Sequence, residues 1–201
     1  MITSVIVAGV AFTGSAAADA PPDSPATDPG NLQVSLLNES NDANVTFGVN
    51  TTSKTINKTN ATDSDVAVGS VNSDLDNTAK AIQFAIDNAT TEYSTVRVGP
   101  GIYNSSVSID VNDLTLEGAD GASSTIIGQS SVAVTSTTPN VEIADLRIEN
   151  PDGSRAVRVT GDAAGVVIQD NTVTNVNTNN DANQPRGIVV GGLDSGDRAD
   201  G

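Results

Sequence analysis

The 201-residue chain contains no cysteine and no histidine, and only nine of its residues are lysine or arginine. Without cysteine it can form neither a disulfide nor a thiolate metal site. Without histidine, Ser-His triads, histidine-ligated zinc and imidazole acid–base catalysis are excluded. Aromatic residues are also few: Phe12, Phe47, Phe84, Tyr93 and Tyr103. We therefore do not expect a stacked aromatic platform for sugar rings or bases.

The charge of the chain is strongly one-sided. Acidic residues outnumber basic ones by 25 to 9, which gives a formal net charge of −16. Such a surface repels phosphates and anionic lipids, so neither nucleic acid nor a membrane is an expected partner. High salt would screen the self-repulsion, which favours a halophilic protein. An ordinary acidic extracellular protein is the alternative.

What the chain does have is an internal repeat. Residues 131–150, moved forward by 25, fall without a gap on residues 156–175. The matched pairs are Val132 with Val157, Val134 with Val159, Val141 with Val166, Ile143 with Ile168, Asp145 with Asp170, Ile148 with Val173 and Asn150 with Asn175. A fixed period of this size is typical of stacked repeats, and Val and Ile spaced by two indicate strands. The sequence therefore predicts an all-β fold, a parallel β-helix solenoid.

One segment has helical periodicity instead. Apolar residues recur at a spacing of three or four, and Asp76 or Asn77 could cap the first turn. The apolar positions are Ala79, Ile82, Ala85, Ile86 and Ala89. We expect a short N-terminal α-helix that covers the open end of the solenoid.

The chain divides into three parts by composition. Residues 1–18 predict a secretory signal peptide, because an apolar run too short to span a membrane precedes small residues. Residues 19–64 form a polar, sequon-rich connector that opens with four prolines. Within it, the alternating stretches 32–36 and 45–49 are either edge strands or no regular structure. Residues 65–201 are the expected β-helix domain, which we predict to be an incomplete fragment.

The segment Val7-Ala8-Gly9-Val10-Ala11-Phe12-Thr13-Gly14-Ser15-Ala16-Ala17-Ala18 resembles the leaders of surface-layer glycoproteins of halophilic archaea. The resemblance covers these residues alone. It implies export to the cell surface or the medium, and it carries no information on activity.

A second resemblance covers about residues 65–201. Ala81-Ile82-Gln83-Phe84-Ala85-Ile86-Asp87, then Val96-Arg97-Val98-Gly99-Pro100-Gly101-Ile102-Tyr103 and Leu114-Thr115-Leu116-Glu117-Gly118, resemble the cap and first turn of pectin-lyase-like proteins. The resemblance implies a right-handed parallel β-helix with a short N-terminal capping helix. Lyases of this superfamily use calcium-binding Asp clusters and an Arg base. Arg147 and Arg158 should face outward as such a base must, but no dense acidic cluster accompanies them, and solvated surface arginines are the alternative.

Seven Asn-x-Ser/Thr motifs precede residue 110. They begin at Asn38, Asn44, Asn50, Asn57, Asn60, Asn88 and Asn104. In a secreted protein these are expected sites of N-glycosylation. Chance sequons in Asn- and Thr-rich sequence are the alternative.

The candidates for catalysis are Asp145 and Asp170, which the repeat brings to one column. Stacked strands lie about 4.8 Å apart, and two carboxylates about 5 Å apart would suit a retaining glycosidase or a cation site. Solvated turn residues are the alternative. For Asn150, Asn171 and Asn175 we expect hydrogen bonds to turn backbone. No cofactor and no metal site are predicted. Residues 191–197 resemble one imperfect calcium-binding Gly/Asp repeat, which would imply calcium as a cofactor, and a flexible truncated end is the alternative.

These features together predict a secreted or cell-surface structural or adhesive β-helix glycoprotein. Polysaccharide or other cell-surface components are the expected partners, and no membrane insertion of the mature protein is expected. The competing interpretation is a polysaccharide lyase or glycoside hydrolase whose catalytic residues lie beyond Gly201.

Overall fold

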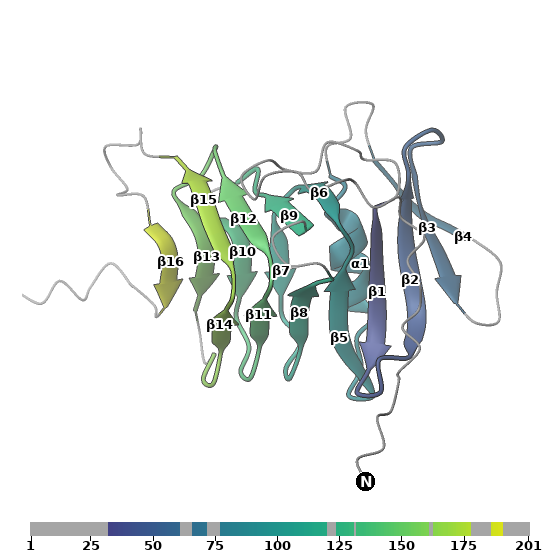
Figure 1. Cartoon of the computed structure of the whole chain (residues 1–201), viewed down its shortest axis with the longest axis horizontal. Coiled ribbons are helices and arrows are strands. Elements are labelled where there is room, and N and C mark those ends of the chain that lie inside the picture. Colours follow the sequence, from purple (N-terminus) through teal and green to yellow (C-terminus); the bar gives the residue numbers. More distant parts are fainter. Residues whose placement is uncertain are drawn as a thin grey trace, which may run out of the picture.

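The computed structural model describes residues 32–60, 66–71, 77–119, 124–130, 132–160, 163–177 and 186–190. These residues form mostly strands, with a single short helix, α1 (Lys80–Asp87). The strands belong to three sheets (Figure 1). No helix in the described part of the chain is long and apolar enough to cross a membrane.

Sheet A has eight strands in the order β14-β11-β8-β5-β1-β2-β3-β4. They are β1 (Gln33–Asn38), β2 (Ala43–Asn50), β3 (Thr55–Asn60), β4 (Val66–Ser70), β5 (Tyr93–Val98), β8 (Thr115–Gly118), β11 (Glu142–Ala144) and β14 (Val167–Gln169). The pairs β5–β8, β8–β11 and β11–β14 are parallel. The pairs β4–β3, β3–β2, β2–β1 and β1–β5 are antiparallel. Sheet A is therefore mixed.

Sheets B and C have four parallel strands each. Sheet B contains β6 (Gly101–Asn104), β9 (Ser124–Ile127), β12 (Arg147–Asn150) and β15 (Thr172–Val176). Sheet C contains β7 (Val107–Ile109), β10 (Val132–Ser136), β13 (Arg155–Val159) and β16 (Arg186–Val190). From β6 onward the chain visits sheets B, C and A in turn, so three consecutive strands make one layer of the molecule.

The sequence repeat matches the strand register only in part. In sheets A and B, Ile143 pairs with Ile168 and Ile148 with Val173, each 25 residues further along the chain. In sheet C, Val134 pairs with Val157 instead of Val159, because the stretch of chain that leads from β10 to its partner β13 is two residues shorter than the 25-residue repeat. The gap-free alignment therefore misplaces the valines of β10 by one strand period.

The hydrophobic core lies between the three sheets. Alternate residues of each strand point inward, as the two-residue strand period requires. Leu116 and Ile143 of sheet A, Ile126 and Ile148 of sheet B, and Val134 of sheet C are all fully buried. The period-two Val and Ile pattern thus identifies the inward faces of the strands.

Helix α1 closes one end of the sheets, where it packs against β1, β2, β5 and β7. Its buried residues are Ala81, Ile82, Ala85 and Ile86. The side-chain amide of Gln83 bonds both backbone groups of Ser108, at 3.0 Å each, and so replaces a neighbouring strand at the edge of β7. The predicted Asn77 cap is wrong: the N-cap is Ala79, without a side-chain hydrogen bond. Asp76 lies outside the described residues.

The largest departure from the sequence prediction concerns residues 33–60. Polar composition suggested a connector here, but β1, β2 and β3 form antiparallel hairpins that continue sheet A (Figure 1). The turns fit the sequence, since Asn41 and Lys54 take positive φ values of 62° and 58°, and Asn50 Oδ1 accepts hydrogen bonds from Thr52 N and Ser53 N. Of the two alternatives for the stretches 32–36 and 45–49, strands are observed.

The expected fold class, an all-β right-handed parallel β-helix with a short N-terminal capping α-helix, is therefore wrong. The described residues form one mixed eight-stranded sheet and two parallel four-stranded sheets. The physical reason for the difference is the burial of apolar side chains on β1 and β2. Val34, Leu36 and Phe47 are 0–1% exposed and are therefore buried as fully as the inward residues of β5. The N-terminal hairpins are thus part of the same core.

Candidate functional site

Asp145 and Asp170 occupy equivalent tight turns, directly after β11 and β14. Both residues are exposed, and both have left-handed backbone conformations, with φ values of 55° and 53°. Aspartate tolerates this region better than most residues, because its short polar side chain can bond locally. The backbone therefore supplies a structural reason for an aspartate at each position. Within the described ranges, no group of three or more potential metal ligands forms at these turns or elsewhere.

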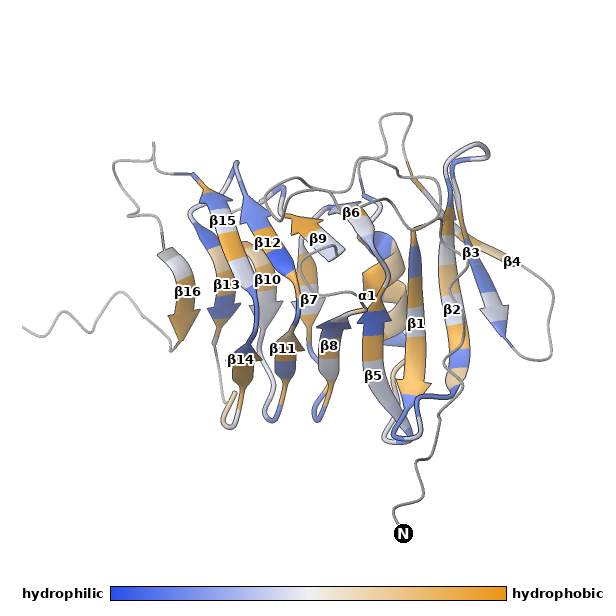
Figure 2. Cartoon of the chain, in the orientation of Figure 1, coloured by the Kyte–Doolittle hydropathy of each residue, from blue (hydrophilic) through white to orange (hydrophobic). Residues whose placement is uncertain are grey.

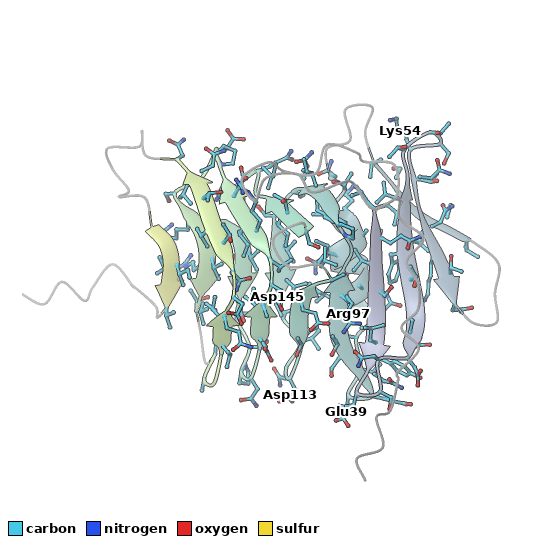
Figure 3. All side chains as sticks on the ribbon, in the orientation of Figure 1. Glu39, Lys54, Arg97, Asp113 and Asp145 are labelled. Carbon is cyan, nitrogen blue, oxygen red and sulfur yellow. The ribbon has the colours of Figure 1, made fainter. Side chains whose placement is uncertain are left out.

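A further set of residues with left-handed backbone conformations precedes β8, β11 and β14. Asp113, Asn140 and Gly165 have φ values of 57°, 56° and 72°, and Asn140 Nδ2 donates to Asp113 Oδ1 at 2.9 Å. Figure 3 shows Asp113 and Asp145 at opposite ends of the short strands of sheet A. The sequence analysis missed this column, although Asp, Asn and Gly at spacings of 27 and 25 residues are the signal that would have found it.

The asparagines bond to backbone and neighbouring side chains, and the expectation for Asn171 is confirmed. Asn171 Oδ1 accepts a bond from Leu146 N at 3.0 Å, while its Nδ2 donates to Ile143 O and Gln169 O at 2.7 and 2.8 Å. Asn150 Nδ2 donates to Arg155 O at 2.6 Å. Asn175 Nδ2 instead donates to a carboxylate, that of Glu149, at 3.1 Å.

Arg147 has the strand parity opposite to the fully buried Ile148, as the alternation predicts, but it is not a solvated surface arginine. Arg147 and Glu149 on β12 are only 9% and 8% exposed, and Arg147 Nε donates to Glu149 Oε1 at 2.7 Å. The hydroxyls of Thr125 and Thr174, on the strands to either side, are buried without a hydrogen-bond partner. Arg147 is therefore already committed to an intramolecular ion pair.

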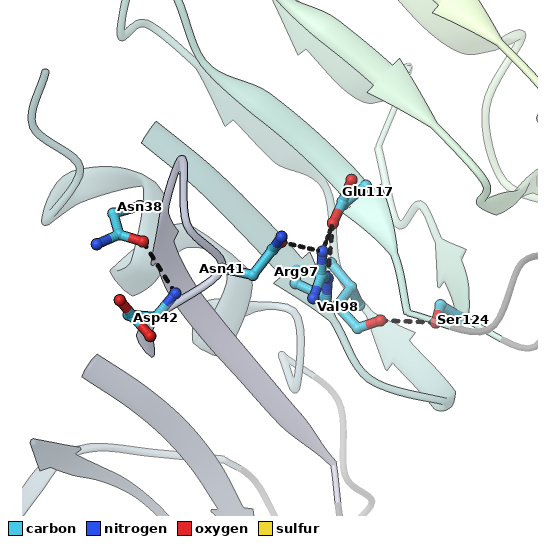
Figure 4. Close-up of polar contacts among 7 residues, drawn as sticks. All are labelled: Asn38, Asn41, Asp42, Arg97, Val98, Glu117 and Ser124. Carbon is cyan, nitrogen blue, oxygen red and sulfur yellow. Dashed lines mark hydrogen bonds and ion pairs between the residues drawn. The ribbon is translucent and has the colours of Figure 1, made fainter. Parts of the chain in front are cut away.

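Arg97 is also paired. Its Nε donates to Glu117 Oε1 at 2.6 Å across the β5–β8 pair, and its second terminal nitrogen donates to Asn41 Oδ1 at 2.8 Å (Figure 4). These bonds fasten the β1–β2 turn to the outer face of sheet A. The two arginines with described ion pairs therefore serve the architecture.

Two arginines of sheet C lack such partners. In the part of the chain that the structure describes, the side chains of Arg155 and Arg158 make no hydrogen bond or ion pair. Both are half-buried, and Arg158 lies between the inward residues Val157 and Val159, so it has the outward parity of β13. Its register partners on β10 and β7 are Thr135 and Ser108.

Basic residues are concentrated in this part of sheet C. The backbone of Arg155 pairs with that of Arg186 on β16, so three of the nine basic residues lie on two adjacent strands of a chain with net charge −16. We call the outward column of Arg158, Thr135 and Ser108 the arginine face. Arg155 begins β13 with the parity of the inward residues Val157 and Val159 and does not belong to it. An unpaired guanidinium offers up to five N–H donors in a planar fork, which suits carboxylate and sulfate groups. Hydroxyls beside it are suitable partners for sugar hydroxyls.

The asparagines of the seven sequons all lie within the described residues, and none of them is fully buried. Asn44, Asn50 and Asn88 are exposed, and the other four are half-buried. Asn44 and Asn50 alternate with buried Val45 and Val49 and so belong to the outer face of sheet A. Asn88 Nδ2 is held by the carbonyl of Phe84 at 2.8 Å. The strands of sheet C carry no sequon.

The predicted leader and the Gly/Asp-rich segment 191–197 lie outside the described residues. Searches with family models, with curated proteins and with solved structures find no match for the chain. The resemblances to pectin-lyase-like proteins and to archaeal surface-layer leaders thus remain predictions from the sequence. Function has to be argued from the geometry of the chain itself.

Proposed function

We propose that this protein is a secreted or cell-surface structural or adhesive protein that binds polysaccharide through the arginine face. The observation that carries the proposal is the guanidinium of Arg158, which has no hydrogen-bond or ion-pair partner among the described residues and belongs to the same outward column as Thr135 and Ser108. In a chain of net charge −16, a cation that no acidic side chain of the described residues neutralises is available to an external anion.

The chemistry of the face favours an acidic polysaccharide over a neutral one. Arginine binds planar carboxylates with two parallel hydrogen bonds. Hydrogen bonds to charged groups are worth about 1.5–3 kcal/mol each, so one lost guanidinium should weaken binding by about tenfold or more. Adjacent strands lie about 4.8 Å apart, close to the length of one sugar unit in an extended chain, so Ser108, Thr135 and Arg158 offer one contact per unit.

Glycans on the sequons would leave this face open. The sequons of β2 and β3 lie on sheet A, and Asn104 ends β6 of sheet B. Sugars at these sites would lie on sheets A and B, whereas Asn88 is the C-cap of α1, the helix that packs against β7. This arrangement supports a glycoprotein with one uncovered binding face.

The test is calorimetric titration of the chain with a polyuronate and with a neutral glucan of similar length. Arg158→Gln should weaken polyuronate binding about tenfold or more, whereas neutral glucan should bind weakly to the wild type and to the variant alike. Arg97→Gln is the matched control, since it removes the same charge from sheet A. Equal losses in Arg97→Gln and Arg158→Gln would reduce the effect to net charge and refute a site on the arginine face. Thermal melts of each variant separate loss of binding from loss of folding.

A further inference from the structure

Two of the seven sequons lie entirely inside strands, where the two-residue period decides which way they face. Their asparagines and hydroxyl residues are Asn44 and Thr46 on β2, and Asn57 and Thr59 on β3. Thr46 and Thr59 are direct register partners. Residues i and i+2 of a strand share a face, and Asn57 follows the fully buried Ile56, so both motifs lie on the outer side of sheet A. We call the outward residues of the two strands, Asn44, Thr46, Gly48, Asn50, Thr55, Asn57 and Thr59, the hairpin face.

The asparagines of these two motifs are free to carry a substituent. Asn44 is exposed and Asn57 is half-buried, and neither side chain makes a hydrogen bond with the described residues. Gly48 lies directly opposite Asn57, and a Cβ atom at Gly48 would meet no other atom within 4 Å. A sugar on either side-chain nitrogen would therefore break no described bond, and beside Asn57 it would meet open space.

The hairpin face is polar without being charged. The chain has 25 acidic residues, yet the one charged residue within β1, β2 and β3 is Lys58, which has the inward parity of Ile56. In Figure 2 the ribbon of β2 alternates between hydrophobic and hydrophilic colours, as expected for a strand with one buried face. A glycan on the outer side would therefore cover neutral hydroxyl and amide groups and would desolvate no charge.

Asn88 has the same motif in a different environment. Its Nδ2 donates to Phe84 O at 2.8 Å, and its Oδ1 accepts a bond from Lys58 Nζ at 3.2 Å. Its backbone N–H also donates to Phe84 O and Ala85 O, so this residue closes the last turn of α1. The Lys58 ammonium is favourable there, because a helix C-terminus carries partial negative charge. A sugar on Nδ2 would replace one of its hydrogens and crowd both partners of the carboxamide.

We propose, on the basis of the export that the proposed function includes, that the hairpin face carries N-linked glycans at Asn44 and Asn57 and that Asn88 carries none. Helix α1 contributes the fully buried Ile82 and Ile86 to the core, so a chain modified at its C-cap should fold poorly. The same helix packs against β7, which carries Ser108 of the arginine face. An unmodified Asn88 therefore keeps sugars away from that face.

The modification is a group transfer to the side-chain amide. Nδ2 of the asparagine bonds to C1 of a sugar that is activated as a polyprenyl phosphate ester. The bond from C1 to the phosphate oxygen breaks, the lipid phosphate leaves with its electron pair, and Nδ2 loses one proton. The acceptor nitrogen must therefore be available, which holds at Asn44 and Asn57 and fails at Asn88.

The test is secretion of the 201-residue chain, behind a host secretion signal, from a eukaryotic host that N-glycosylates its cargo. Peptide mapping of the folded product by mass spectrometry measures the occupancy of each sequon. We expect glycopeptides that contain Asn44 and Asn57, and an unmodified Asn88 peptide. Asn44→Gln and Asn57→Gln should each remove the mass of one glycan, whereas the matched control Asn88→Gln should remove none. A glycan on Asn88 in the folded product, or an unmodified Asn44 or Asn57, would overturn the proposal.

The unglycosylated chain from a bacterial host separates the two roles of these asparagines. Asn44→Gln and Asn57→Gln should leave its thermal midpoint unchanged, because neither side chain has a described hydrogen bond. Asn88→Gln should lower the midpoint by about 2–4 °C, the shift expected from the loss of about one hydrogen bond in a chain of this size. Equal midpoints for all three variants would contradict the role of Asn88 as a cap.

Calorimetric titration of the same unglycosylated chain with polyuronate tests the arginine face independently. Polyuronate binding, together with a secreted protein that lacks glycans at Asn44 and Asn57, would refute the hairpin-face proposal alone. Glycans at both sites without polyuronate binding would refute the arginine face alone.

Discussion

The hydroxyl of Tyr103 donates a hydrogen bond of 2.9 Å to the backbone carbonyl of Gln33, seventy residues earlier in the chain. Tyr103 is fully buried on β6, and Gln33 begins β1, so the bond joins the first strand of sheet B to the antiparallel part of sheet A. Gly99 N donates to the same carbonyl at 2.8 Å. The N-terminal hairpins are thus connected to the layered part by a buried polar contact as well as by the sheet.

Replacing Tyr103 with phenylalanine should destabilise the fold modestly. The carbonyl of Gln33 keeps its bond from Gly99, so the loss is about one ordinary hydrogen bond, roughly 0.5–1.5 kcal/mol. Urea unfolding measures the effect, with Tyr93→Phe as a control on a half-buried tyrosine whose hydroxyl has no described hydrogen bond. A loss above about 3 kcal/mol would show that Tyr103 has a further role.

Alkaline pH should destabilise the wild-type protein through the same residue. Burial raises the pKa of Tyr103 far above its ordinary value of 10. The unfolded chain therefore loses this proton before the folded chain does. The stabilisation is complete below about pH 10 and declines as the pH rises above that value. Thermal melts from pH 8 to pH 11.5 should show this decline in the wild type and in Tyr93→Phe, and a weaker one in Tyr103→Phe.

Period-two hydrophobicity located the strands of the layered part, because each strand buries alternate residues against one continuous core. It did not predict the fold class, because the same alternation in Val34, Leu36, Val45 and Phe47 is diluted by Asn, Thr and Ser on the outer faces. Composition then suggested a connector where the structure has hairpins. The register of sheet C was also not predictable from the repeat. A shift of two residues is one strand period, so inward Val residues face inward Val residues whether the offset is 25 residues or two fewer.

The candidate site was only partly visible in the sequence. Arg158 was correctly expected to face outward, whereas the burial of Arg147 depends on Glu149 and on neighbouring strands that no local pattern reveals. For Asp145 and Asp170 the equivalent positions were predicted, but the left-handed backbone that explains them was not.

Breaking the Arg147–Glu149 pair should cost far more than breaking the Arg97–Glu117 pair. Glu149→Gln leaves a nearly buried guanidinium without its counter-charge, and such losses are about 3–5 kcal/mol. Glu117→Gln is the matched control on a pair whose side chains are 24–29% exposed, and exposed pairs contribute about 0.2–1 kcal/mol. Urea unfolding of both variants measures the difference. Equal costs would contradict the burial of the β12 pair.

At Asp145, stability should depend on backbone conformation and not on charge. Asp145→Gly and Asp145→Asn should stay within about 0.5 kcal/mol of the wild type, because both residues accept positive φ. Asp145→Val should cost about 1–2 kcal/mol or more, since a β-branched residue is disfavoured there. The control is Asp110→Val, at an exposed position without a positive φ. A destabilising Asp145→Asn would instead point to a role for the carboxylate.

Salt should stabilise the whole protein. With 25 acidic and nine basic residues, the folded surface repels itself, and the compact state suffers more from this repulsion than the expanded unfolded chain does. Lowering the salt from about 2 M to about 0.1 M lengthens the Debye length to about 10 Å, so the thermal midpoint should fall. A double variant, Asp110→Asn with Asp152→Asn, removes two exposed negative charges and should reduce the slope of midpoint against salt. If the midpoint is the same at both salts, or if the double variant keeps the full slope, repulsion among the acidic residues does not limit the stability of this fold.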